Sequence, residues 1–155
     1  MKRSSVLILA AMIALAASAS LYSQEANLEL VRADLKAQKV ALVTMNMQLT
    51  DAQSQVFWPI YRKYDAELTV VYDKVISLVK DYAANYAQMT DAKAAELMKG
   101  TLSLMGQRLK LLEKVCGDVA KALGPVLGAR FMQIERQITA ALDLQIGSGM
   151  PLIQK

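Results

Sequence analysis

The stretch "LTDAQSQVFWPIYRKYDAEL", residues 49–68, combines a strong helix start with a proline inside an amphipathic pattern. Thr50 can accept a hydrogen bond from a first-turn amide, and Gln53 can reach back to the amide of Thr50, which together make a capping box. Asp51 adds a negative charge at the positive end of the helix dipole. These features predict that a helix begins directly after Thr50.

Pro59 lies inside this helix and removes the amide that would bond to the carbonyl of Gln55. A proline in a helix interior costs about 3 kcal/mol and kinks or breaks the helix. The apolar pattern nevertheless resumes beyond it, so we expect a kinked helix that extends toward Gln88. The row recurs at alternating spacings of four and three residues, through Phe57, Tyr61, Tyr64, Leu68, Val71, Val75, Leu78 and Tyr82.

A second helix start follows at "MTDAK", residues 89–93, with Thr90 at the N-cap and Lys93 where a glutamine would close the box. Two apolar rows facing one another predict an antiparallel hairpin with coiled-coil-like packing. At 1.5 Å per residue this hairpin would be about 55 Å long, so we expect an elongated molecule. The row of the second long helix comprises Met98, Leu102, Met105, Leu109, Leu112, Cys116, Val119 and Leu123.

Two further helices flank the predicted hairpin. Gly124 and Pro125 end one helix and open the next, which should end near Ile146. A first helix is expected from about Asn27 to Met45. Its apolar face would carry Leu28, Val31, Leu35, Leu42 and Met45.

Helical signals extend over nearly the whole chain, and no stretch alternates as a strand would. The sequence therefore predicts an all-α fold of four helices, with the two long ones forming a central kinked hairpin. We expect one helical domain over residues 20–146 and a flexible tail over residues 147–155.

The beginning of the chain has the pattern of a secretory signal peptide, which we place at residues 1–19. Lys2 and Arg3 precede an apolar run at 6–17, and small residues at 17–19 offer a cleavage site. The run is shorter than the roughly 20 residues that a membrane-spanning helix needs. We therefore expect a periplasmic protein without a membrane span in the mature chain.

Composition disfavours several classes of function. The chain has 18 basic and 14 acidic residues, and loss of Lys2 and Arg3 leaves 16 basic residues and a net charge of +2. This small charge disfavours nucleic acid as a partner. Histidine is absent, which removes the commonest zinc ligand and the commonest neutral-pH general base. Without a catalytic or metal motif, we expect no enzyme activity, no metal and no cofactor.

Sulfur-containing residues leave two alternatives open. Cys116 is the only cysteine, and its place on the apolar row favours a buried, inert thiol over an intermolecular disulfide. Methionine thioethers can bind copper(I). Met98 and Met105 lie on the same row, which favours core packing for them instead.

A second apolar line on the third helix, offset by one residue from the first, is a candidate partner surface. It has two interpretations: packing under the first or fourth helix, or an apolar surface that binds a partner or lies in a homodimer. The line comprises Leu97, Leu104, Leu111 and Val115.

The aromatic residues divide in the same way. Tyr61, Tyr64 and Tyr82 fall on the row and are expected in the core. Three more aromatic residues of this helix region fall off the row and are candidates for a partner surface, with the tryptophan beside the proline the best single candidate; they are Trp58, Tyr72 and Tyr86.

The motif "LTDAQ" at residues 49–53, in a chain of this length with a signal peptide, resembles the LTxxQ-motif family of Spy/CpxP-type periplasmic proteins. The runs "FWPIYRKYDAEL", "DYAANY" and "ARFMQIE" resemble secreted bacterial helical proteins that would form a distant branch. The family resemblance implies a kinked hairpin that dimerises into a thin cradle, and ATP-independent chaperone or envelope-stress activity.

Two functions follow as hypotheses. The first is a periplasmic chaperone-like protein that holds unfolded or envelope proteins on an apolar surface. The second is a structural or adaptor protein that binds one dedicated envelope partner. A promiscuous binder should suppress the aggregation of unrelated proteins, whereas an adaptor should not.

Overall fold

The computed structural model describes residues 36–153. The chain divides into two units, Met1–Leu42 and Val43–Lys155. The predicted signal peptide lies outside the described residues. So does the beginning of the predicted first helix, with Leu28, Val31 and Leu35.

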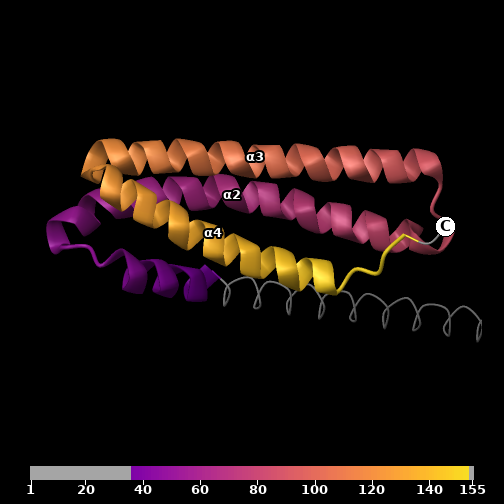
Figure 1. Ribbon diagram of the computed structural model, residues 1–155, viewed down its shortest axis with the longest axis horizontal. Coiled ribbons are helices and arrows are strands. Elements are labelled where there is room, and N and C mark those ends of the chain that lie inside the picture. Colours follow the sequence, from indigo (N-terminus) through magenta and orange to yellow (C-terminus); the bar gives the residue numbers. More distant parts are fainter. Residues whose placement is uncertain (1–35, 154–155) are drawn as a thin grey trace, which may run out of the picture. The chain divides into compact units, whose positions relative to one another are not determined.

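Three long helices follow one another in the second unit (Figure 1). Helix α2 spans Asp51–Asn85, α3 spans Asp91–Leu123 and α4 spans Pro125–Ser148, with a short 3-10 helix, η1, at Tyr86–Gln88. Helices α2 and α3 pack as an antiparallel hairpin, and α4 folds back from the end of α3. Residues 36–153 contain no strand, which confirms the predicted all-α class.

The capping box at the start of α2 is present as predicted. The hydroxyl of Thr50 accepts a hydrogen bond from the amide of Gln53 at 3.3 Å, and the side-chain oxygen of Gln53 accepts one from the amide of Thr50 at 3.0 Å. Gln48 precedes it with φ of 51°, in the left-handed region that turns the chain out of the helix at residues 36–47. Two otherwise unpaired amides are thereby satisfied, which fixes the start of α2.

Helix α2 runs through Pro59 without a break and is one continuous ribbon in Figure 1. The proline takes a hydrogen-bond donor away from the carbonyl of Gln55, one turn earlier. Both residues are exposed, so water can reach that carbonyl. Because Pro59 lies on the solvent-exposed face, the helix continues through it, as the apolar pattern predicted.

A cluster of aromatic rings joins α2 to α4. The ring of Phe131 on α4 lies 5.4 Å from Phe57, 6.2 Å from Tyr61 and 5.9 Å from Tyr64, in edge-to-face contacts. Phe57 and Phe131 are fully buried. The backbone of α3 packs closely on both α2 and α4, whereas α2 and α4 meet through these large side chains. Aromatic area of this kind dominates the energy of a small core.

The rest of the predicted α2 row is also confirmed, with burial that decreases along the helix. Leu68 and Val71 are buried beside the aromatic cluster. Val75, Leu78 and Tyr82 are half-buried toward the hairpin tip. The core is therefore most complete at the end of the hairpin where α4 begins.

The predicted face of the first helix is wrong within its described part. Val43 and Met47 are fully buried, whereas Leu42 and Met45 are exposed. The guanidinium of Arg130 donates to the carbonyl of Met47 at 3.4 Å, which ties the end of this helix to α4. Two apolar lines run side by side on this helix, and the repeat alone cannot show which of them meets the core.

The junction between α3 and α4 consists of Gly124, as predicted. Its φ of 97° suits glycine, and its amide donates to the carbonyl of Ala120 at 2.9 Å. Pro125 follows as the first residue of α4, where its missing amide removes no helical bond. Helix α4 continues two residues past the predicted end at Ile146.

Candidate binding surface

Four large apolar residues form an exposed row on the first half of α3. They recur at spacings of four, three and four residues, so they lie on one face of the helix. Isolated exposed apolar residues are ordinary, but a contiguous row is a feature of binding surfaces. We call this the exposed row; it consists of Met98 (62% exposed), Leu102 (62%), Met105 (54%) and Leu109 (66%).

The exposed row corrects two expectations from the sequence. These residues were predicted to face α2 in the core, and Met98 and Met105 in particular to fill it. The predicted partner surface is instead the core: Leu97 is 6% exposed, Leu104 9% and Val115 3%, with Leu111 half-buried. Only the first half of the predicted row is exposed: Val119 is buried, and Leu112, Cys116 and Leu123 are half-buried, so this part of the row was predicted correctly. The second line is buried, as one of its two interpretations expected.

Helix α4 explains why only part of this face is open. Toward the end of α3 the same face carries Cys116 and Ala120, which are half-buried. Gly128 of α4 packs there so tightly that an added Cβ would lie 2.8 Å from the Cβ of Ala120 and 3.0 Å from the carbonyl oxygen of Cys116. Figure 1 shows α4 drawing away from α3 beyond this point. The exposed row is therefore the uncovered continuation of an existing helix–helix contact.

Gly106 lies beside the exposed row, between Met105 and Leu109. A Cβ added there would meet no atom within 4 Å among the described residues. Glycine in a helix interior costs about 0.5–1 kcal/mol relative to alanine. Packing within the described part of the chain therefore does not require glycine at this position. Close approach of a partner to the row would require it.

Ion pairs from α3 hold both neighbouring helices. Arg108 makes a two-pronged pair with Asp143 of α4, at 2.7 Å for both nitrogen–oxygen contacts. Lys114 reaches Glu67 of α2 at 3.2 Å. Pairs at the surface contribute little stability, but the fork of Arg108 fixes geometry. These contacts orient α3 so that the exposed row faces away from α2.

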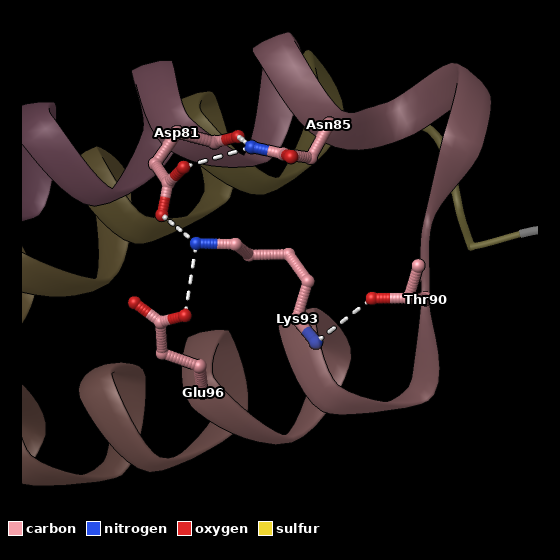
Figure 2. A network of polar contacts seen from close by, with 5 residues as sticks. All are labelled: Asp81, Asn85, Thr90, Lys93 and Glu96. Carbon is pink, nitrogen blue, oxygen red and sulfur yellow. Dashed lines mark hydrogen bonds and ion pairs between the residues drawn. The ribbon is translucent and has the colours of Figure 1, made fainter.

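A third ion pair closes the tip of the hairpin (Figure 2). The Nζ of Lys93 lies 3.3 Å from Asp81 of α2 and 2.9 Å from Glu96 on its own helix. Thr90 accepts a hydrogen bond from the amide of Lys93 at 3.2 Å, so the second cap has one bond and its box is open, as predicted. Lys93 thus connects α3 to α2 in place of capping α3.

The three aromatic residues proposed for a partner surface all have contacts within the chain. Trp58 is half-buried and packs edge-on against Phe57 and Tyr61, with ring centroids at 5.2 and 5.3 Å. Tyr72 is half-buried near Arg108 of α3 and Thr139 of α4, and Tyr86 donates to a carbonyl of the tail. None of the three is fully exposed, so the exposed row of α3 is the better candidate for a partner surface.

A groove of about 320 Å³ lies between α2 and α3 beside Pro59. Its floor includes Tyr64, Leu111 and Val115, and the Lys114–Glu67 pair lies at its edge. The groove is partly open to solvent, and its charged lining residues Lys114 and Glu67 are already paired with each other. It is therefore a minor apolar depression next to the core.

Two buried acids were not expected from the sequence. Glu135 is 1% exposed and accepts a hydrogen bond from the hydroxyl of Tyr64 at 2.8 Å, and Asp65 is 8% exposed. Burial, with the nearby negative charge of Glu135, raises the pKa of Tyr64 well above its usual value, so this hydroxyl stays a proton donor. Spacing was the available signal, because Glu135 follows Gly128 and Phe131 on the buried face of α4.

Cys116, predicted as a buried thiol on the row that faces α2, is half-buried and lies where Gly128 of α4 packs on α3. Burial, and secondarily the charge of Glu135, raises the pKa of the Cys116 thiol to about 11. Within residues 36–153 no three acidic or cysteine side chains are placed to hold a metal ion. No helix of this described part is long and apolar enough to cross a membrane.

Together the helices define an all-α protein with an open apolar face on its longest hairpin. Comparison of the chain with protein-family models, curated proteins and solved structures found no match.

Proposed function

We propose that this protein is an exported, non-enzymatic binding protein that holds other proteins, chaperone-like, on the exposed row of α3. The observation that supports the proposal is the row itself: four large apolar side chains, each more than half exposed, on one helix face. Apolar surface contributes about 25 cal/mol per Å² when it is buried, and this row offers it without any specific polar partner. Such a surface suits clients that expose apolar segments.

Flexible side chains strengthen this interpretation. Two of the four residues, Met98 and Met105, have unbranched thioether side chains that adapt to differently shaped partners. Surfaces of this kind bind promiscuously because they can repack. Gly106 beside them leaves room for a partner backbone to approach.

An aggregation assay with unrelated unfolding proteins tests the proposal. Leu102→Gln combined with Leu109→Gln should abolish suppression of aggregation while circular dichroism stays unchanged, because both side chains are more than 60% exposed. The matched control is Val126→Gln with Leu144→Gln, two residues of α4 that are 76% and 74% exposed. Equal loss of activity in both pairs would contradict a role for the row.

Glycine variants on α3 provide a second matched pair. Gly106 beside the row and Gly117 away from it both have space for a side chain. Gly106→Leu should impair client binding by filling the space that a partner would enter, whereas Gly117→Leu should not. Failure of the wild-type protein to protect any unrelated client would instead favour the adaptor alternative, with one dedicated partner.

The same row is our proposed contact for a homodimer. Charge substitution at Leu104 would not test dimerisation, because that side chain is buried in the core. Leu109→Asp is the appropriate change, and it should convert a dimer to a monomer in sedimentation experiments without loss of helix. A wild-type monomer at micromolar concentration would exclude the dimer and leave the row to other partners.

A further inference from the structure

The tail beyond α4 lies against two tyrosines near the hairpin tip. The hydroxyl of Tyr82 donates a hydrogen bond to the carbonyl of Pro151, and the hydroxyl of Tyr86 donates one to the carbonyl of Leu152. The two tyrosines are four residues apart, so they lie on the same face, with ring centroids 5.8 Å apart. The two hydroxyls therefore bond to two consecutive carbonyls of the tail.

These contacts recognise the main chain of the tail and not its side chains. Leu152 is 89% exposed and Pro151 is also exposed, so neither side chain is held in a pocket. Residues 151–153 have neither helical nor strand structure. Backbone carbonyls are present in every sequence, so the tyrosine pair can accept segments other than the tail.

Proline favours such a segment for a physical reason. Pro151 has its φ fixed near −65° by its ring, so the chain around it is already close to an extended conformation. Less conformational entropy is then lost when the segment docks on the tyrosines. Aromatic surfaces with hydroxyl or indole donors recognise proline-rich segments in other proteins on the same principle.

The tail is held weakly enough to be exchanged. Each neutral hydrogen bond contributes little net stability, because water competes for the same groups, and the exposed Leu152 adds little apolar burial. The tether gives the tail an effective concentration on the order of millimolar, as for other short flexible linkers. A competing segment must therefore reach a similar concentration, or bind additional surface.

We propose that Tyr82 and Tyr86 form a docking site for extended, proline-containing segments of other proteins, which the chain's own tail occupies when no such segment is present. The site is separate from the exposed row and does not depend on it. Its occupant is a segment of main chain with free carbonyls, as in an unfolded protein.

Backbone amide signals of Leu152 and Ile153 in NMR spectra of the full chain report whether the tail is docked. The double variant Tyr82→Phe with Tyr86→Phe keeps both rings but removes both donors, so these signals should move to the positions of a free peptide. Tyr72→Phe, on the same helix but without a bond to the tail, should leave them unchanged. Unchanged tail signals in the double variant would overturn the proposal.

Binding in trans is tested by adding the synthetic peptide GMPLIQK, the sequence of residues 149–155, to the wild-type chain. Tail signals should move toward their free positions, with half of the change at roughly millimolar peptide. The peptide with alanine in place of its proline should require a several-fold higher concentration. No change at about ten times that concentration would overturn a site for other chains. Signals that shift with protein concentration alone would assign the site to the tail of a second copy, which also overturns the proposal.

Discussion

Two apolar rows of α3 have similar side chains and opposite environments. The buried row, with Leu97, Leu104 and Val115, packs into the core, whereas the exposed row begins one residue later. Both recur with the spacing of a helix face. The difference shows that the position of the neighbouring helices, and not the chemistry of the side chain, determines which row is covered.

The length and direction of α4 account for the exposed row. Helix α4 has 24 residues against 33 in α3; it packs tightly on α3 at Gly128 and draws away from it farther along (Figure 1). Beyond Asp143, its partner for Arg108, few residues of α4 remain. An apolar face that begins under α4 therefore continues into solvent.

The comparison predicts its largest difference for neighbouring residues, one from each row. Leu104→Ala should lower the free energy of unfolding by about 2–4 kcal/mol, because it leaves a cavity against α2. Met105→Ala should change it by less than about 0.5 kcal/mol, since Met105 is 54% exposed. Urea unfolding measures both. Similar losses for the two variants would mean that the rows are equally buried in solution.

Thiol reactivity distinguishes the covered and uncovered parts of the same face. With a pKa of about 11, Cys116 should be about 0.1% thiolate at pH 8 and react slowly with an alkylating reagent. A Met105→Cys, Cys116→Ser chain places an exposed thiol on the open part. Its labelling should be faster by about two orders of magnitude. Equal rates would show that α4 does not cover Cys116.

Two glycines give opposite predictions for the same substitution. Gly128→Ala should destabilise the protein by about 1–3 kcal/mol, because its new Cβ collides with the backbone and side chain of α3. Gly106→Ala should stabilise it by about 0.5–1 kcal/mol, because the added methyl group meets open space and favours the helix. Thermal and urea unfolding should give the two signs. Stabilisation in both variants would argue against close packing of α4.

The helix starts predict the smallest differences. Thr50→Ala should cost about 1 kcal/mol, because it breaks a closed capping box at the start of α2. Thr90→Ala should cost less, since only one bond is lost and Lys93 still connects α3 to α2. Denaturant titration of the two single variants tests this order. A larger loss at Thr90 would mean that the hairpin tip depends on its cap more than on its ion pair.

Helix ends were the most predictable feature of this sequence. Thr50, Thr90 and Gly124 mark their boundaries by local chemistry, which a sequence displays directly. The row on α2 was also predicted correctly, because its largest side chains, Phe57, Tyr61 and Tyr64, all fall on one helix face. On α3 two lines compete, and only the arrangement of three helices shows which one is covered.

Other features depended on contacts between distant residues. The bond from Tyr64 to Glu135 joins positions 71 residues apart, so the spacing that places Glu135 on the buried face of α4 does not reveal its partner. Lys93 departs from the capping-box pattern, but its reason lies in Asp81 on the opposite helix. Such departures are informative only once the partner is known.

The single-residue junction at Gly124 has a consequence for the order in which the protein folds. One glycine joins α3 to α4, so the last turn of α3 and the first turn of α4 meet with almost no loop to close. This corner can therefore form early. The ring of Phe131 then has to meet α2 across a separation of about 70 residues. We expect the corner to be structured in the folding transition state and the aromatic cluster to form later. The α3–α4 corner would thus act as the folding nucleus on which α2 completes the core.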